Sequence, residues 1–346
     1  MSLLNGVSEF FGLDIGTTGL RAVQVANNPK NKQLLKYATA PVDSKTSQSD
    51  SKADQQKLAE KIREMIASAG ITTKNVAVGL PSQRVFTTVV DIERLEPNEM
   101  AKTIQYQADS LIPTPVAESK IDWSVIGDSP AAANKVEVLL TSVTNEYVES
   151  RLDLIESIGL NVIAFEPDNL ALTRSITSPG ATEPQMVLDI GSKSTDLVIT
   201  MNGAPRLTRS IPTGSEAIIR AAVQNLNIDE KQAQEFVAKF GLSANKLEGQ
   251  VYHAIIGTID LLMNDIGKSI KFFQTRYRDT NISRIVMTGG ASSLPEFPLY
   301  IANKTGIDVE IGNAWRNIVY DPSRQNELMA VSNHFGVATG LAERDE

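Results

Sequence analysis

Two aspartates mark the part of this sequence where chemistry is most readily placed. Asp14 and Asp189 each end an apolar run, and each precedes Ile-Gly and a short turn rich in Gly, Ser and Thr, in the stretches FGLDIGTTGLRAVQV and MVLDIGSKSTDLVIT. Glycine-rich turns allow backbone N–H groups to converge on an anion, and a carboxylate at a strand end can hold a hydrated Mg²⁺ ion. The residue types therefore predict two phosphate-binding turns, each beside an aspartate that acts on magnesium through water.

The spacing of these stretches adds to their meaning. Leu-Asp-Ile-Gly occurs at residues 13–16 and again at 188–191, so the two copies lie 175 residues apart. A single copy is more often an ordinary β-hairpin with a glycine turn, because such hairpins are common. Two copies half a chain apart indicate a duplicated fold whose halves hold a nucleotide phosphate tail between them.

Composition narrows the class of protein. The 346 residues carry a net charge of −8 and predict two domains or one bilobed domain, and the acidity disfavours nucleic acid binding as the main activity. The absence of cysteine excludes disulfides and a cysteine nucleophile, and the only two histidines, His253 and His334, disfavour a histidine metal site. No apolar run approaches the roughly 20 residues of a membrane-spanning helix, and residues 1–12 lack the cationic flank of a signal peptide. We therefore expect a soluble, cytoplasmic protein.

Hydrophobic periodicity predicts the elements that position the first aspartate. The following segments are expected in the first half of the chain: three short strands within residues 11–42, a polar loop at 43–56, a helix over 58–69, a buried strand at 75–80 and an inserted α+β module at 82–165.

The second half contains a further candidate site and a candidate helix contact. Residues 214–278 are predicted to be mostly helical, and a short strand at 284–287 precedes Thr288-Gly289-Gly290. A strand before Gly-Gly and a helix after it can let a ligand touch the backbone, although the same pattern also forms an ordinary tight turn. A C-terminal helix is expected over 335–342, where Gly336 and Gly340 lie four residues apart and so permit another helix to approach closely.

The order of these motifs resembles the actin, Hsp70 and sugar-kinase ATPase superfamily. Within it, the chain is similar to the PilM family of type IV pilus assembly proteins, which is related to the division protein FtsA. The resemblance covers nearly the whole chain and rests on stretches that include IQYQADSLIPTPVAESKIDWSV, VESRLDLIESIGLNVIAFEPDNLALTRS and FGVATGLAER. FtsA normally carries a C-terminal membrane helix, and no such helix is visible in this sequence.

The resemblance implies an α/β, two-lobed, actin-like fold of the duplicated ribonuclease H-like type, with an inserted α+β subdomain in the first lobe. In the implied division, the first lobe contains residues 1–81 with part of 166–180, and residues 82–165 form the inserted subdomain. The second lobe contains residues 181–213 and 280–346, and its C-terminal helix returns to the first lobe. Residues 214–279 form a mainly helical subdomain.

The resemblance also implies ATP and Mg²⁺ in a central cleft. Asp14 and Asp189 are expected to act on the metal through water. The residues implied in nucleotide binding are Asp14, Gly16, Thr17, Thr18, Arg21, Asp189, Gly191, Ser192, Ser194, Gly214, Gln234, Gly289, Gly290 and Ser292. Glu166 occupies the position of the residue that polarises the attacking water, and it reads equally well as a carboxylate at a helix N-terminus.

The sequence departs from the family pattern on both sides of the expected nucleotide. Arg21 stands where lysine is usual, and a planar guanidinium binds phosphate with a different reach. Gln234 and Val237 stand where the family often has glutamate and lysine beside the adenine, and Glu235 or Lys239 could compensate. These departures favour at most a slow ATPase and leave open whether ATP is bound at all.

The resemblance implies an adaptor whose partner is the cytoplasmic N-terminal tail of the inner-membrane protein PilN. The peptide is expected in a groove within residues 75–165, where it would hold this protein at the inner membrane and connect it to the pilus motor ATPases and platform. Two other classes of function stay open: an active phosphotransferase of the same superfamily, and an FtsA-like division protein that forms filaments.

Overall fold

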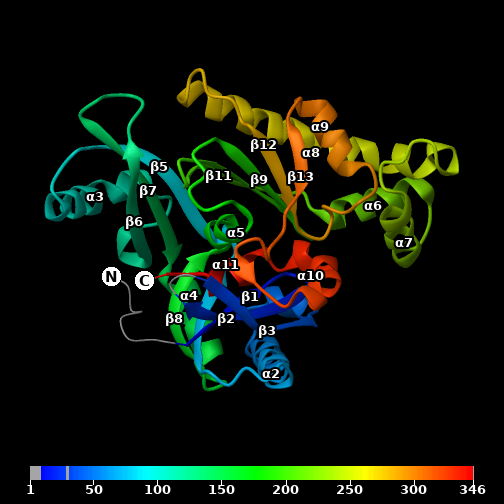
Figure 1. The fold of residues 1–346 in the computed structure, drawn as a ribbon, viewed down its shortest axis with the longest axis horizontal. Coiled ribbons are helices and arrows are strands. Elements are labelled where there is room, and N and C mark those ends of the chain that lie inside the picture. Colours follow the sequence, from blue (N-terminus) through cyan, green and yellow to red (C-terminus); the bar gives the residue numbers. More distant parts are fainter. Residues whose placement is uncertain (1–8, 29–30, 346) are drawn as a thin grey trace.

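Two sheets of the same topology form the frame of the molecule (Figure 1). The computed structural model describes residues 9–28 and 31–345, so most of the segment considered above as a signal peptide lies outside it. The first sheet has the strand order β14-β3-β2-β1-β4-β8, and the second has the order β11-β10-β9-β12-β13. In each sheet an antiparallel three-stranded meander continues into parallel strands. The predicted duplicated, two-lobed α/β fold is therefore confirmed.

The strands of the two sheets have the following bounds. The first sheet contains β1 (Phe11–Ile15), β2 (Gly19–Asn28), β3 (Asn31–Pro41), β4 (Asn75–Leu80), β8 (Asn161–Pro167) and β14 (Ile318–Val319). The second contains β9 (Gln185–Ile190), β10 (Thr195–Met201), β11 (Ala204–Ile211), β12 (Arg284–Thr288) and β13 (Asp308–Ile311).

Helices cover the outer face of each sheet because each carries one apolar stripe. The α-helices are α1 (Ser44–Gln48), α2 (Lys52–Ser68), α3 (Pro97–Leu111), α4 (Asn145–Glu156), α5 (Asp168–Ile176), α6 (Ser215–Leu226), α7 (Glu230–Phe240), α8 (Gln250–Arg276), α9 (Phe297–Thr305), α10 (Gln325–Val331) and α11 (Gly336–Ala342). Helices α2 and α4 share a core with the first sheet, and α6, α7, α8 and α9 share one with the second. No helix in the described ranges is long and apolar enough to cross a membrane.

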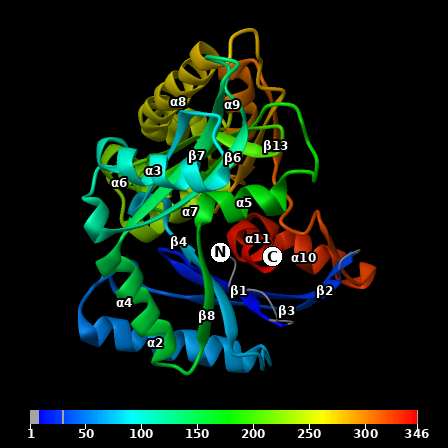
Figure 2. The same cartoon turned by 90° about the vertical axis from the view of Figure 1, so that its left-hand side faces the viewer.

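Helices α5 and α11 lie between the two sheets and form the centre of the molecule (Figures 1 and 2). Their apolar residues share one core with Val187 and Val286 of the second sheet and Ala77 of the first. The glycines of α11 permit this contact, because a Cβ on Gly340 would lie 1.7 Å from the carbonyl oxygen of Ala171. The expected close helix approach is therefore made by α5, and α11 returns to the first lobe.

The inserted module is a separate three-stranded sheet with its own core. Its strands are β5 (Val85–Glu93), β6 (Ser119–Asp128) and β7 (Lys135–Thr144), in the order β5-β7-β6, and α3 packs on one face. Residues 145–165, which were expected inside this module, instead form α4 and β8 and belong to the first lobe. Sequence periodicity identifies both elements but does not say which sheet they join, because β8 pairs with β4 across about 80 intervening residues.

Residues 43–56 were expected to form a polar loop, and this prediction is wrong. They contain α1 and the start of α2. Asp43 caps α1 by accepting hydrogen bonds from the backbone N–H groups of Lys45 and Thr46, and Ser51 caps α2 by accepting one from Asp54. The Ser- and Asp-rich composition that resembles a loop is here a set of helix caps.

Glu343, just after α11, gives a testable pH dependence of stability. The residue is 2% exposed, Oε1 of its carboxyl group has no hydrogen-bond partner, and burial raises the pKa of this group to about 7. Between the unfolded pKa of about 4.3 and pH 7, the folded chain holds a proton that the unfolded chain has released, so this group lowers the unfolding free energy as pH rises.

We therefore expect Glu343→Gln, which is neutral throughout, to be more stable than the parent by about 3 kcal/mol at pH 8 and equal to it at pH 4. Urea unfolding at several pH values measures this difference. If the difference in unfolding free energy between variant and parent is the same at pH 4 and pH 8, then packing, and not the carboxyl charge, is responsible.

Candidate functional site

The two predicted hairpins have the same register but opposite charge at one position. Asp14 on β1 lies opposite Arg21 on β2, and Asp189 on β9 lies opposite Asp196 on β10. Both pairs are seven residues apart in sequence, so the second copy carries an acid where the first carries a base. Asp196 was not among the predicted site residues, although the hairpin register alone could have identified it.

Four carboxylates and one guanidinium come together where the hairpins meet. This acidic centre consists of Asp14, Arg21, Asp168, Asp189 and Asp196. Nη1 of Arg21 lies 3.0 Å from Oδ2 of Asp14. Burial raises the pKa of Asp189 to about 7, with further raising by the charges of Asp196 and Asp14. Three carboxylates thus remain without a basic partner of their own in the described part of the chain, which makes the centre strongly attractive to a cation.

Asp168 is the second residue that sequence reasoning missed. It begins α5, directly after β8, and its Oδ1 is buried without a hydrogen-bond partner. Burial raises its pKa well above the ordinary range, and the charges of Asp14 and Asp196 raise it further. Gly79 on β4 leaves the space for this carboxyl group, since a Cβ there would lie 2.2 Å from Oδ1.

The hairpin turns are fixed by their own hydrogen bonds. The backbone N–H of Gly16 donates to the carbonyl of Gly19 at 3.0 Å, and that of Gly191 donates to Ser194 at 2.9 Å. Thr17 and Thr18 complete the first turn, and the carbonyl of Thr17 accepts a hydrogen bond from the Ser47 hydroxyl at 2.7 Å.

The second turn also contacts the start of α6. The Ser192 hydroxyl donates to Oε1 of Glu216 at 2.6 Å, and the backbone N–H of Glu216 donates to the Ser192 carbonyl at 2.9 Å. Gly214 is required at this contact, because a Cβ would lie 2.4 Å from the same carbonyl oxygen. The second lobe therefore places a helix N-terminus directly behind its phosphate-type turn.

The Gly289-Gly290 turn reaches the acidic centre from β12. Gly289 has a φ of +85°, and a Cβ on it would lie 2.4 Å from Oδ1 of Asp189. The Ser292 hydroxyl donates to the Gly289 carbonyl at 2.7 Å and so fixes the turn. His334 lies beside Gly290, and burial together with the charge of Arg21 lowers the pKa of its imidazole. This histidine is a third neighbour of the site that the sequence did not identify.

Two predicted site residues have surroundings that differ from the expected ones. Glu166 is 5% exposed, and its carboxylate forms ion pairs with Arg174 and Arg344. Gln234 lies on the exposed face of α7, where its amide donates to Glu230 at 3.3 Å, and Val237 belongs to the core of the second lobe. The structure therefore brings the hairpin and glycine-turn residues together but gives Glu166 and Gln234 other contacts.

The donor chemistry of the acidic centre fits a hydrated Mg²⁺ ion and the phosphates that accompany it. Carboxylate oxygens are the ligands that this hard cation prefers. A triphosphate alone would be repelled by the acids, whereas Arg21, a bound metal and the turn N–H groups would together offset its charge. The unpartnered carboxylate oxygens of Asp168 and Asp196 are consistent with such a cation.

A second feature lies at the corner between the first lobe and the module. A cavity of about 820 Å³ is bounded by the start of α2, by the 3₁₀ turn Val116–Glu118 and by α4. Its lining includes five exposed carboxylates, namely Asp50, Glu118, Glu146, Glu149 and Asp153. Lys52 is the one basic residue in the lining, and none of the five acids forms an ion pair within residues 9–28 and 31–345. The cavity therefore favours a basic ligand.

Comparison with known proteins places these features in a family. A family model described as type IV pilus assembly protein PilM matches residues 12–346. Among solved structures, the PilM-PilN type IV pilus biogenesis complex is similar with a TM-score of 0.82, 24% identity and coverage of 96% of this chain and 97% of that one.

More distant relatives share the fold. The ethanolamine utilization protein EutJ from Carboxydothermus hydrogenoformans has a TM-score of 0.58 and 14% identity, with coverage of 96% of this chain and 88% of that one. MreB5 of Spiroplasma citri, bound to ADP, has a TM-score of 0.54 and 12% identity, with coverage of 96% and 95%.

Proposed function

This chain belongs to the PilM family of type IV pilus assembly proteins, and on that premise we propose that it is a nucleotide-binding adaptor of a type IV pilus machine. It binds ATP with Mg²⁺ at the acidic centre and the cytoplasmic N-terminal tail of PilN in the cavity beside α2 and α4. The single observation that carries the nucleotide half is the meeting of two duplicated aspartate hairpins, one from each lobe, at one group of carboxylates.

Each element of the centre has a role in holding Mg-ATP. Asp14 and Asp189 would hold the magnesium ion through water, and Arg21 with the turns at residues 16–18 and 191–194 would bind phosphate oxygens. Gly289 and Gly290 allow the nucleotide to contact the backbone. The metal supplies the positive charge that lets a triphosphate approach four carboxylates.

Turnover of the nucleotide is expected to be slow. The carboxylate of Glu166 is engaged in ion pairs with Arg174 and Arg344, so its oxygens are not free to orient an attacking water. Asp168 lies in the acidic centre, where burial, and then the charges of Asp14 and Asp196, raise the pKa of its carboxyl group. The arrangement supports binding and conformational change better than rapid hydrolysis.

Charge and shape of the cavity support a peptide ligand with basic and apolar side chains. The five unpaired acids attract lysine and arginine, and the exposed Ala117 offers apolar surface for leucine-type side chains. Docking of a membrane protein's tail would hold this adaptor on the cytoplasmic side of the inner membrane, where motor ATPases and the platform are within reach.

The proposal is tested by calorimetric titration of the purified protein with Mg-ATP and with a PilN tail peptide. We expect both to bind. We also expect Glu149→Lys together with Asp153→Lys to weaken peptide binding at least tenfold while leaving the affinity for Mg-ATP unchanged. Raising the salt concentration from 0.05 to 0.5 M should weaken peptide binding more than Mg-ATP binding.

The matched control is Glu156→Lys, because Glu156 is an exposed acid of the same helix outside the cavity lining. If all variants bind the peptide with equal affinity, the cavity is not the peptide site. Mg-ATP-dependent pelleting on sedimentation would favour a filament-forming protein, and phosphorylation of an added acceptor would favour a phosphotransferase.

A further inference from the structure

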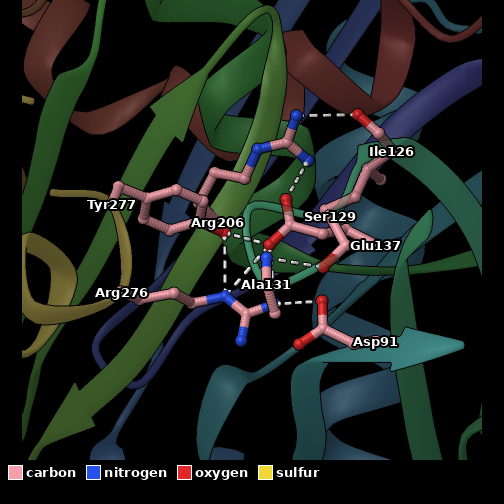
Figure 3. A network of polar contacts seen from close by, with 8 residues as sticks. All are labelled: Asp91, Ile126, Ser129, Ala131, Glu137, Arg206, Arg276 and Tyr277. Carbon is pink, nitrogen blue, oxygen red and sulfur yellow. Dashed lines mark hydrogen bonds and ion pairs between the residues drawn. The ribbon is translucent and has the colours of Figure 1, made fainter. Parts of the chain in front are cut away.

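A buried ionic network joins the inserted module to the second lobe (Figure 3). Its centre is Glu137 on β7, whose side chain is 1% exposed. Oε1 of Glu137 accepts hydrogen bonds from Nη2 of Arg276 at 2.7 Å and from the Tyr277 hydroxyl at 2.6 Å. On its other side, Oε2 lies 3.4 Å from Nη1 of Arg206, whose side chain is 3% exposed. The module thus inserts a carboxylate between two arginines of the second lobe.

The network is balanced in charge and anchored at both ends. Asp91 on β5 accepts a hydrogen bond from Nη2 of Arg276 at 2.8 Å, so two acids of the module face two arginines. Tyr277 packs on Phe273 in the second-lobe core. Removing one member of such a set leaves a buried charge without compensation, which costs far more than losing an exposed pair. The module and the second lobe are therefore held together unless the whole network opens.

Backbone contacts extend the same interface. Nη2 of Arg206 donates to the carbonyl of Ile126 at 2.8 Å, and the Thr208 hydroxyl on β11 donates to the Thr87 carbonyl on β5 at 3.4 Å. Gly127 has a φ of +151° at a register shift of β6, and a Cβ there would lie 2.9 Å from Nη2 of Arg206. The module strand is thus shaped to receive this arginine.

The module is attached much more loosely to the first lobe. The chain passes between them at Pro81–Val85 and at Thr144–Asn145, and the Asn145 amide donates to the Ala117 carbonyl at 3.1 Å. No ion pair joins residues 85–144 to the first lobe in the part of the chain that the structure describes. The 820 Å³ cavity lies on this side of the module.

We propose that the Glu137 network makes the module move with the second lobe, so that rotation of the lobes about the nucleotide changes the shape of the cavity. Lobe closure around a ligand is a common rigid-body motion, and a segment fixed to one lobe must shift against the other. By linkage, a ligand that prefers one cavity shape also prefers one lobe angle, so nucleotide and peptide influence each other's affinity. This inference rests on the proposed function, because it places nucleotide and peptide at the sites argued above.

The absence of cysteine allows distances to be measured between pairs of introduced spin labels. One pair, Gln56→Cys on α2 with Ala117→Cys in the turn Val116–Glu118, joins a first-lobe residue and a module residue of the cavity lining. A second pair, Lys61→Cys on α2 with Lys231→Cys on α7, spans the two lobes. In the parent protein we expect Mg-ATP to shift the mean distance of both pairs, on the order of 5 Å for the cavity pair.

Two variants break the network from opposite sides, namely Glu137→Gln and Arg206→Met. In both we expect a broader cavity distance distribution even without nucleotide, and a loss of at least half of its shift with Mg-ATP, while the interlobe shift remains. Arg94→Gln is the matched control, because it breaks the exposed Arg94–Asp128 pair of the same module and should behave as the parent. Far-UV circular dichroism verifies that each variant is folded.

The outcomes separate this inference from the proposed function. If the interlobe pair responds to Mg-ATP but the cavity pair does not, or if both network variants keep a narrow and fully responsive cavity distance, the module does not follow the second lobe and the inference is wrong. If calorimetry detects no Mg-ATP binding, the nucleotide half of the proposed function has failed. The widths of the ligand-free cavity distributions then decide whether the network holds the module.

Discussion

Asp189→Asn is expected to weaken Mg-ATP binding at least about 100-fold and, at the same time, to stabilise the protein without ligand. Both effects follow from one feature, which is that the carboxyl group lies among Asp14, Asp168 and Asp196. Burial, and then the charges of Asp196 and Asp14, raise its pKa to about 7. The pKa of this aspartate in the unfolded chain is about 3.9. Between pH 4 and pH 7 the unfolded chain therefore releases a proton that the folded chain keeps, so the free energy of unfolding falls as pH rises. The total decrease is about 4 kcal/mol at pH 8.

Calorimetry measures the loss of affinity, and urea unfolding at pH 4 and pH 8 measures the gain in stability, which should be present only at the higher pH. Asp54→Asn on α2 is the matched control. Hydrogen bonds from Ser49 and Ser51 lower the pKa of this half-buried aspartate, so its replacement should slightly destabilise the chain and leave Mg-ATP binding unchanged. A destabilised Asp189→Asn, or one that binds Mg-ATP as the parent does, would show that the acidic centre is not a strained cation site.

The expected loss of Mg-ATP affinity and gain in stability indicate that Asp189 is retained for binding and not for folding. Most substitutions of a buried residue destabilise, because they remove packing or leave a polar group unpaired. A residue whose neutral isostere is more stable is retained for another reason, and a cation that offsets the repulsion supplies one. The same argument applies to Asp196, which lies directly opposite Asp189 in the hairpin register.

Local patterns were sufficient to predict the hairpins and the duplicated sheets. The alternation around Asp14 and Asp189, the turn glycines and the repeat of Leu-Asp-Ile-Gly all depend on residues within one hairpin, so the sequence contains what specifies them. The glycine spacing of α11 likewise predicted a close helix contact, because only a residue without a side chain permits one.

What sequence reasoning missed depends on contacts between distant segments. Whether Glu166 or Asp168 reaches the acidic centre is decided by Arg174 and Arg344, which hold Glu166 elsewhere, and by Gly79, which leaves space for Asp168. No pattern near Glu166 reveals these partners. The Glu137 network is equally hidden, because it joins residues of four separate elements and each of them alone reads as an ordinary surface charge.

Among the glycines in the described part of the chain, Gly340 is the one whose replacement by alanine is expected to affect folding most. The new Cβ would lie 1.7 Å from the carbonyl oxygen of Ala171, well inside contact distance, and Gly340 and Ala171 both belong to helices. Because neither backbone can move without separating α11 from α5, we expect a loss of at least about 4 kcal/mol in unfolding free energy, or no soluble protein. Gly257→Ala in α8 is the control, because nothing lies within 4 Å of its added Cβ. Alanine there should stabilise the helix by about 0.5–1 kcal/mol.

The position of α5 and α11 determines how the Gly340→Ala defect should spread. Their shared core includes Val187 and Val286 of the second sheet as well as Ala77 of the first, so a separation of the helices exposes apolar surface of both lobes. Urea unfolding followed by Trp315, which packs on Phe335 just before α11, should therefore coincide with loss of helix signal from the whole chain. If Trp315 instead became exposed at a lower urea concentration than the second lobe unfolded, α11 would be a locally detachable element. The two lobes would then be joined mainly through the module and its Glu137 network.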